Sequence, residues 1–490
     1  MKKGTSVILK NNYKGGFLID ILKNNSKIFE QVPIKYAIDG NLCLVDSVKP
    51  HKDRKLFFKL LNQKKLNKIV EICLEDKVDF LIVNFWDTYF NYGALLTAYS
   101  MQELVQSYGF TTKHLDVGQR TNKECFKNSF MEDFTKNYLN VTNKLNYNKA
   151  NELSKNVKGV ILGSDQILRC KYINYNLHKY LLNWVDINTK KIAISASFGV
   201  NKDEFLSFGN FSQDIKETML NALNSFDYLS CRESSGKDIY RDVFGLNSDW
   251  IFDPVFLIDK EYFNKILERA TVDCSNKIVS YVLDMNDEYN DLYKYLSKKE
   301  NLEIANIDNK KLKVEDWLKS IKDCKYLITD SFHGVCFALI FNKPFICIKN
   351  KNRGNARFET IIKYFNIQKN FVNSVNEIYN NNNFMSIDFL TINKKIEEKR
   401  EADLQIIKKV LQENYSNNEN AQLNKLTNIK FIKTQIKNKN FTSYENFKLK
   451  IKYYRCKFLA NFTFGKLKKH YIEKKYCLKQ KIRNNGVVGW

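Results

Sequence analysis

Short apolar runs alternate along this chain with longer stretches in which apolar residues recur every three or four positions. The first clear unit starts with the run Phe80-Leu81-Ile82-Val83, passes through a polar turn, and continues in a helix-like stretch from Ala94 to Tyr108. An apolar run of four residues followed by helical spacing is typical of a buried strand and the helix that covers it. The pattern therefore predicts a β-loop-α unit from residue 80 onwards.

More units of this kind follow in the first half of the chain. Strand-like runs occupy 159–162, 191–195 and 228–231, and a helix-like stretch occupies 214–224. Each of these strands ends in a polar or glycine-rich turn. Because ligands bind at the carboxyl ends of strands in open α/β sheets, we expect these turns to mark one edge of a sheet as a site.

A second α/β domain is predicted beyond residue 259. A helix-like link at 260–270 precedes a fresh strand, Ile278 to Leu283. The elements that follow, in order, are a helix at 314–323, a strand at 326–329, a helix at 335–341 and a strand at 345–348. The predicted fold class is therefore α/β, with two domains facing a cleft.

The remaining segments are assigned to an extension, a closing helix and a tail. A chain of 490 residues suits two domains with accessory segments. The predicted divisions are 1–76 (an N-terminal extension of unassigned role), 77–258 (the first domain), 259–395 (the second domain), 396–415 (a closing helix) and 416–490 (a basic, aromatic tail). The extension contains short stretches of alternating pattern, such as 42–45, and a basic run with helical spacing at 54–74.

Cysteines and apolar runs indicate the compartment. The eleven cysteines form no CxxC pair and no ligand-like cluster, which favours reduced thiols in a cytoplasmic protein. The apolar stretch after Lys3 is too short for a signal-peptide core. The longest apolar run, 335–348, is interrupted and shorter than the roughly 20 residues that span a bilayer. We therefore expect a cytoplasmic protein, with attachment to the inner face of the cell membrane as an extension of that expectation.

The formal net charge of +25 is concentrated at one end of the chain. Residues 421–490 hold 18 Lys and Arg against two Glu, whereas the other 420 residues hold 61 against 52. Aromatic residues such as Phe462, Phe464 and Tyr471 lie among the lysines of this tail. Three interpretations stay open: an anionic membrane surface as partner, a solvated lysine-rich tail, and, less favoured, a nucleic acid.

The stretch Asp330-Ser331-Phe332-His333-Gly334 lies where the strand-like run at 326–329 gives way to a helix-like run. Such a turn aims backbone N–H groups and the positive end of the helix dipole at one point, where an anionic group can bind. His333, one of five histidines, would lie beside that anion and could donate a proton. The alternative interpretation is that Asp330 or Ser331 only caps the helix.

Six turns, taken in their order along the chain, resemble the polysaccharide pyruvyl transferase family. The matching segments are Asn91–Tyr99, Gly163–Gln166, Ser195–Gly199, Arg232-Glu233, Asp253–Leu257 and Thr329–Gly334. No single segment is specific, but six in this order are hard to match by chance. The resemblance covers roughly residues 78–370.

This resemblance implies a GT-B-like fold of two Rossmann-like domains, with the first on the acceptor side. It also implies transfer of the carboxyethylidene group of phosphoenolpyruvate onto sugar hydroxyls of a cell-surface polysaccharide or its lipid-linked precursor, as a pyruvate ketal. Protonation of the enol carbon makes a cation at the adjacent carbon, which a sugar hydroxyl attacks before phosphate leaves. Because no step is a redox step, we expect no cofactor and no obligatory metal, with phosphoenolpyruvate as the donor substrate.

Three residues are assigned catalytic roles by this resemblance. His333 is the expected general acid, Arg232 the expected cation for the donor, and Asp165 a candidate acceptor of the proton of the attacking hydroxyl. The expected substrate-binding residues are Asn91, Tyr92, Gly93, Ser164, Gln166, Asp330, Ser331, Gly334, Arg353 and Arg357.

Some of these residues have plainer interpretations. Asn91 can be a helix cap, and Arg353 and Arg357 can belong to a surface loop. Ser331 stands where some family members have an Arg, so the charge that neutralises the donor phosphate must come from elsewhere, and Arg353 and Arg357 are the candidates.

Two other functions remain as alternatives. The first is a nucleotide-sugar-dependent glycosyltransferase on the same two-domain plan, with the turns holding a diphosphate. The second is a basic peripheral membrane or nucleic-acid binding protein in which the turns are structural. The acceptor sugar, the linked hydroxyls and the oligomeric state cannot be read from this sequence.

Overall fold

The computed structural model describes residues 5–11, 17–23, 26–33, 78–87, 91–117, 129–170, 177–207, 213–308, 312–349, 354–379 and 384–413, the first three ranges as backbone only. The chain divides into two compact units. One comprises Met1–Phe80 with Gly109–Thr112, and the other comprises Leu81–Tyr108 with Lys113–Trp490.

The first unit contains a three-stranded antiparallel sheet. Strands β1 (Thr5–Asn11), β2 (Phe17–Lys23) and β3 (Ser26–Pro33) pair in the order β1-β2-β3. The β2–β3 register shifts between Ile19 and Ile21. The sequence patterns predicted no sheet here, and the stretches expected at 42–45 and 54–74 lie outside the described residues.

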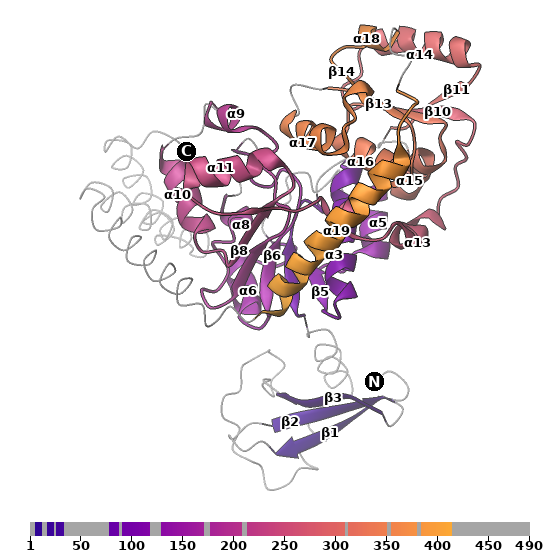
Figure 1. The fold of residues 1–490 in the computed structure, drawn as a ribbon. Helices are drawn as coiled ribbons and strands as arrows, with labels where there is room; N and C mark the ends of the chain where they lie inside the picture. The colour runs from indigo at the N-terminus through magenta and orange to yellow at the C-terminus, as the bar shows by residue number, and fades with distance from the viewer. Residues whose placement is uncertain are drawn as a thin grey trace, which may run out of the picture. The chain divides into compact units, whose positions relative to one another are not determined.

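A six-stranded sheet forms the first Rossmann-like domain. Its strands, in spatial order, are β5 (Thr112–His114), β4 (Phe80–Val83), β6 (Gly159–Leu162), β7 (Lys190–Ala193), β8 (Tyr228–Cys231) and β9 (Asp249–Trp250). The pairs β6–β7, β7–β8 and β8–β9 are parallel. The helices of this domain are α3 (Tyr92–Ser107), α5 (Phe130–Tyr138), α6 (Tyr147–Ser154), α8 (Leu177–Tyr180), α9 (Lys202–Leu206), α10 (Gln213–Leu223), α11 (Ser234–Phe244) and α12 (Pro254–Leu257) (Figure 1).

A five-stranded parallel sheet forms the second Rossmann-like domain. Its order is β11 (Glu303–Asn306), β10 (Lys277–Tyr281), β12 (Tyr326–Thr329), β13 (Phe345–Ile348) and β14 (Phe371–Val372). The link η1 (Lys260–Phe263) and α13 (Asn264–Leu267) precedes this sheet. The helices and turns that accompany it are α14 (Asp287–Glu300), α15 (Val314–Asp323), α16 (Phe332–Ile340), α17 (Ala356–Phe365), η3 (Gln368–Asn370) and α18 (Asn376–Tyr379).

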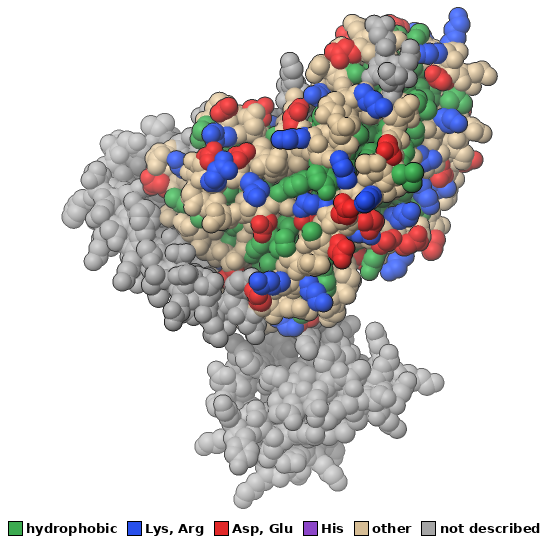
Figure 2. Space-filling model, in the orientation of Figure 1, with side chains coloured by type: hydrophobic (Ala, Val, Ile, Leu, Met, Phe, Trp, Pro, Cys, Tyr) green, Lys and Arg blue, Asp and Glu red, His purple; other side chains and the backbone are tan. Residues whose placement is uncertain are grey.

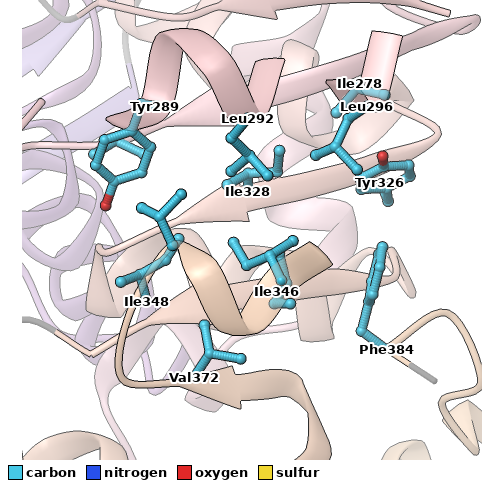
Figure 3. Packing of buried hydrophobic residues seen from close by; sticks show 13 residues of the cluster. Ile278, Tyr289, Leu292, Leu296, Tyr326, Ile328, Ile346, Ile348, Val372 and Phe384 are labelled. Atoms are coloured by element: carbon cyan, nitrogen blue, oxygen red, sulfur yellow. The ribbon is translucent and has the colours of Figure 1, made fainter. Parts of the chain in front are cut away.

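The core of the five-stranded sheet explains why its strands β12 and β13 are mostly apolar runs. Ile328 of β12 and Ile346 of β13 are fully buried in a cluster that also contains Leu292 and Leu296 of α14 (Figure 3). Strands covered on both faces need apolar residues at successive positions rather than alternating ones. The fold class predicted from the sequence, α/β with two Rossmann-like domains, is confirmed.

Helix α19 (Phe389–Gln412) closes the described part of the chain. It begins at Phe389, before the helix expected at 396–415, because the Asp388 side chain caps it by accepting from the Thr391 N–H. Its contacts reach both domains. The Asp403 carboxylate accepts from the Phe252 N–H at 2.9 Å, and the Tyr364 hydroxyl donates to the Lys395 carbonyl at 3.1 Å.

The described surface mixes both signs of charge. Figure 2 shows Lys and Arg side chains interspersed with Asp and Glu over the described part of that face. Within the described ranges, no helix is both long enough and apolar enough to cross a membrane.

Candidate active site

The side chain of Ser331 starts helix α16 and brings His333 to its first turn. The Ser331 hydroxyl accepts from the Gly334 N–H at 3.3 Å, so Ser331 is the N-cap. Asp330, the other candidate cap, instead accepts from the backbone N–H groups of Leu283 and Asp284 at 2.7 and 3.2 Å. Asp330 therefore holds the end of β10 beside the start of α16.

His333 is buried and joined to α3 of the other domain. Its Nε2 lies 3.0 Å from the Thr97 hydroxyl and 3.8 Å from the Asp253 carboxylate. The Thr97 hydroxyl donates to Asp253 at 3.4 Å. Since a hydroxyl has one proton, Thr97 accepts from Nε2–H when it donates to Asp253. The imidazole is thus held through Nε2.

Gly93 makes this approach of α16 to α3 sterically allowed. A Cβ added at Gly93 would lie 2.1 Å from Nδ1 of His333 and 2.4 Å from its Cγ. No side chain is therefore compatible with the observed position of the imidazole. The expected role of Gly93 in substrate binding stays a prediction.

Arg232 follows β8 and is completely buried in a network of carboxylates. It donates to Asp253 at 2.6 Å, to Asp165 at 3.0 Å and to the Ser164 hydroxyl at 3.3 Å. Ser164 in turn donates to Asp253 at 3.0 Å. Burial opposes the charge of Arg232, yet Asp253 and Asp165 outweigh burial and raise the pKa of the guanidinium above its ordinary value.

The two carboxylates of this network are held ionised. Burial alone would raise the pKa of Asp165, but the charge of Arg232 outweighs it and the pKa lies below its ordinary value. The same balance, with hydrogen bonding from His333 added, places the pKa of Asp253 far below its ordinary value. An ion-paired carboxylate with a lowered pKa is a weak base, so the geometry disfavours Asp165 as a proton acceptor.

Asp165 also has a left-handed backbone conformation, with a φ of +86°. Its carboxylate accepts from the Gln166 N–H at 2.7 Å and from the Asn91 amide at 3.3 Å. Asn91 caps α3 as well, by accepting from the Ala94 N–H at 3.1 Å. The cap interpretation of Asn91 thus describes a contact in the structure, and its expected role in substrate binding stays a prediction. Strained residues of this kind cluster at functional sites.

Glu233 shapes the turn after β7. Its carboxylate accepts from the N–H groups of Phe198 and Gly199 at 2.7 and 2.9 Å, and from the Ser197 hydroxyl at 3.0 Å. The adjacent side chains of Arg232 and Glu233 thus bind different groups. Arg232 binds carboxylates at the sheet edge, and Glu233 binds the turn beside it.

Arg357 brings a second buried guanidinium to the site. Arg357 lies on α17, and its Cζ is 5.2 Å from the centre of the Phe332 ring, while that of Arg232 is 4.7 Å from the same centre. Burial and the neighbouring charge of Arg232 lower the pKa of Arg357 to about 10. Charge repulsion between guanidinium groups at this position is therefore only partly offset by carboxylates, which is the environment an anionic ligand needs.

A third arginine lies close by. Arg169 donates to the Gln166 amide oxygen at 2.6 Å, and its positive charge contributes to the lowered pKa of Arg357. Gly354, with a φ of +86°, precedes α17, and a Cβ added there would lie 2.0 Å from the Gly199 carbonyl. The two domains thus meet backbone to backbone beside the arginines.

Two other predicted site residues, Tyr92 and Gly334, contact protein groups outside this network, and a third lies outside the described residues. The Tyr92 hydroxyl donates to the Leu312 carbonyl at 2.6 Å, which joins the two domains. Gly334 packs on Thr329, whose hydroxyl would lie 2.6 Å from an added Cβ. Arg353 lies outside the described residues.

The comparison with protein families gives one match. The model of the polysaccharide pyruvyl transferase family matches residues 91–352, more than half of the chain, and this range contains every described residue of the network except Arg357. The chain belongs to the polysaccharide pyruvyl transferase family.

The solved structures similar to this family member are distant from it. One is UDP-GlcNAc 2-epimerase from Neisseria meningitidis bound to UDP-GlcNAc (12% identity, TM-score 0.39, 73% of this chain and 100% of that chain). Another is Medicago truncatula UGT71G1 complexed with UDP-glucose (9% identity, TM-score 0.39, 67% of this chain and 94% of that chain). A third is E. coli ADP-heptose lps heptosyltransferase II (8% identity, TM-score 0.29, 66% of this chain and 99% of that chain). Among curated proteins, none matches the sequence.

Five residues of this pyruvyl transferase-family site were not among the predicted site residues: Thr97, Arg169, Glu233, Asp253 and Phe332. Asp253 had a signal, since Asp253-Pro254 was one of the matching segments, and an Asp before Pro at the start of a helix also reads as a cap. Thr97, Glu233 and Phe332 also lie within matching segments, but Thr97 contacts His333 across 236 residues, which no local pattern encodes. Arg169 lies in no matching segment and had no signal.

In the part of the chain that the structure describes, no group of three or more His, Cys, Asp and Glu residues is arranged to hold a metal ion. The expectation of a reaction without a metal or cofactor stays a prediction.

Proposed function

We propose that this protein transfers the carboxyethylidene group of phosphoenolpyruvate to two sugar hydroxyls, forming a pyruvate ketal. The observation that carries the proposal is the placement of a buried imidazole, His333, next in sequence to the aromatic ring on which Arg232 and Arg357 both lie. The dipeptide Phe332-His333 thereby places the proposed acid, the His333 imidazole, beside the two guanidinium groups that could attract an anion. Family membership supports the same assignment.

Arg357 and Arg169 are the proposed ligands of the donor. Phosphoenolpyruvate carries a phosphate and a carboxylate close together, and guanidinium groups bind both in bidentate fashion. An anion beside Arg357 would offset the charge that lowers its pKa to about 10. These arginines supply the charge that Ser331 lacks.

Arg232 has a positioning role in this proposal rather than direct contact with the donor. Its guanidinium is committed to Asp253, Asp165 and Ser164. Asp253 in turn holds Thr97, which holds Nε2 of His333. The network therefore fixes the imidazole, and Nδ1 is the nitrogen to which no described residue makes a hydrogen bond.

The proposed reaction balances in two steps. His333 gives a proton to the methylene carbon of phosphoenolpyruvate, and the first sugar hydroxyl attacks the cationic adjacent carbon and returns its proton to the imidazole. The carbon–oxygen bond to phosphate then breaks, and the second hydroxyl forms the ketal while its proton leaves with phosphate. One phosphate is released for each ketal formed.

The test uses the acceptor material of a cell that lacks this gene. Its surface glycan and lipid-linked precursors, incubated with the purified full chain and phosphoenolpyruvate, are expected to release inorganic phosphate and to gain a pyruvate ketal detectable by mass spectrometry. His333→Ala is expected to abolish both signals, whereas His178→Ala, which changes an exposed histidine on α8, is expected to keep them. Release of a nucleotide from a nucleotide sugar, with no phosphate from phosphoenolpyruvate, would contradict the proposal.

A further inference from the structure

Asn84 is a buried amide at the carboxyl edge of the six-stranded sheet. It is the first residue after β4 and is 1% exposed. The next strand in the sheet is β6, and Asn84 lies against its first following residue: a Cβ added at Gly163 would be 3.2 Å from the Asn84 Cβ and 3.6 Å from its Nδ2. Asn84 therefore lies on the edge that also carries Ser164 and Asp165.

Both polar atoms of this amide lack a partner within the described residues. Neither Nδ2 nor Oδ1 of Asn84 makes a hydrogen bond there. Burial of an amide without hydrogen bonds is unfavourable, and an unpaired group of this kind in a folded protein calls for a ligand or an ordered water. Two nearby amides are by contrast bonded: Asn91 to Asp165 and to the start of α3, and Gln166 to Arg169.

The position of Asn84 indicates the chemistry of the ligand. Arg232 follows β8, which is separated from β4 by β6 and β7, so Asn84 lies on the other side of the network from that guanidinium. An uncharged amide offers two N–H donors and one oxygen acceptor. A sugar hydroxyl, which both donates and accepts, matches this set, whereas a phosphate or carboxylate matches the arginines.

We propose that Asn84 binds a hydroxyl of the sugar acceptor and contributes to the choice of acceptor. This inference rests on the proposed function. The absence of a side chain at Gly163 allows the amide to keep its place at the sheet edge, and the bound hydroxyl supplies the hydrogen bonds that no described residue supplies.

The test measures binding of donor and acceptor separately in Asn84→Leu and Asn84→Ala. With the glycan and lipid-linked extract of the deletion strain as acceptor, KM for the extract is expected to rise about tenfold, the loss of a hydrogen bond to an uncharged group. KM for phosphoenolpyruvate is expected to stay within about twofold of wild type. The melting temperature of Asn84→Leu is expected to stay equal or to rise, because the variant removes an unpaired buried amide.

Asn370→Leu is the matched control. The Asn370 amide is also fully buried, but it donates to the carbonyls of Phe345 and Phe384, at 2.8 Å each. Its replacement is expected to lower the melting temperature and to leave both KM values unchanged.

Two outcomes overturn the inference and are distinct from failure of the proposed function. If the wild-type chain releases phosphate but Asn84→Leu and Asn84→Ala keep the wild-type KM for the extract, Asn84 does not bind the acceptor. If Asn84→Leu lowers the melting temperature as Asn370→Leu does, with KM for the extract unchanged, the amide has a structural partner such as a buried water. Absence of phosphate release by the wild-type chain contradicts the proposed function itself.

Discussion

Arg232 and Arg357 lie against the same Phe332 ring but differ in what surrounds their charges. Arg232 is bonded to Asp165 and Asp253, whereas the pKa of Arg357 is lowered by burial and by the charge of Arg232. Removal of the Arg232 guanidinium leaves the Asp165 and Asp253 carboxylates buried without their partner. Removal of the Arg357 guanidinium relieves its repulsion by the charge of Arg232. The two arginines should therefore be separable by stability and by donor binding.

Arg357→Gln is expected to weaken phosphoenolpyruvate binding by roughly 10- to 100-fold, as expected for a charge-assisted hydrogen bond, with little loss of stability. Arg232→Gln is expected to lose about 3–5 kcal/mol of unfolding free energy, because Asp165 and Asp253 stay buried without their partner. Calorimetric titration with phosphoenolpyruvate and thermal unfolding measure the two effects. Arg241→Gln, which changes an exposed arginine, is the control and should alter neither. Equal stability losses at positions 232 and 357 would contradict this distinction.

The low pKa of Asp253 predicts a specific dependence of stability on pH. Because its folded-state pKa lies below the ordinary value of 3.8, the carboxylate stabilises the fold fully above that value, and the contribution is lost as pH falls through the folded-state pKa. The difference in melting temperature between wild type and Asp253→Asn should be largest near neutral pH and shrink below about pH 3.8. Thermal unfolding over a pH series measures it, and a difference that stays constant down to pH 2 speaks against the ionised pair.

At this scale the sequence predicted residues better than their partners. His333, Arg232, Asp165 and Ser164 belong to one network, as their selection for one site implies. The expected role of Tyr92 in substrate binding stays a prediction, and the donation of its hydroxyl to a carbonyl 220 residues away was not foreseen. Hydrogen-bond partners so distant in sequence depend on how the domains meet, which no local pattern encodes.

At the scale of elements, the packing of α16 on α3 determines where the imidazole lies. A methyl group at Gly93 would overlap the His333 ring, since its carbon would be 2.1 Å from Nδ1. Gly93→Ala is therefore expected to abolish turnover and to cost about 1–3 kcal/mol of unfolding free energy through overpacking.

The double variant Gly93→Ala/His333→Ala identifies the cause of that loss. In the His333→Ala background the overlapping ring is gone, so the further cost of Gly93→Ala should fall close to zero in chemical denaturation. An undiminished cost would show that Gly93 is required by α3 itself rather than by the imidazole.

Elements with strong local signals were predicted closely, and weak ones were missed. The runs at β4, β6, β12 and β13 were predicted with their observed bounds, because strands buried on both faces are mostly apolar, and β8, which contains Ser230, was predicted with its bounds as well. Strand β7 ends at Ala193 rather than Ser195, since Ser195 turns to a φ of +56°. Strands β9 and β14 have two residues each, and β5 reads Thr-Lys-His, so neither length nor apolarity marks them.

At the scale of the whole molecule, the site draws on both domains. His333 comes from the five-stranded domain, whereas Thr97 and Asp253 come from α3 and from the end of the six-stranded domain, and Thr97 is 236 residues from His333. Arg357 comes from the five-stranded domain as well. A chain pattern can predict two domains, but which residues meet between them follows only from the assembled structure.

The charge of the whole chain leads to a separate prediction. Residues 421–490, which lie outside the described residues, carry 18 Lys and Arg against two Glu. Deletion of this segment is expected to abolish binding to vesicles that contain anionic lipid and to leave turnover of a soluble acceptor unchanged. Vesicle sedimentation and phosphate release measure the two properties. Binding that survives the deletion would contradict an anionic membrane surface as the partner of this segment. Loss of all turnover would contradict the predicted division between this tail and the two domains.

The central claim is that the pyruvate carbon of phosphoenolpyruvate becomes the ketal carbon of a glycan at the site around His333. The most direct measurement supplies phosphoenolpyruvate labelled at its central carbon, with the glycan and lipid-linked extract as acceptor, and follows the label by NMR. We expect a new ketal carbon bonded to two sugar oxygens, formed in step with phosphate and absent with His333→Ala. Label that remains in phosphoenolpyruvate or appears only as free pyruvate, with the wild-type chain, would contradict it.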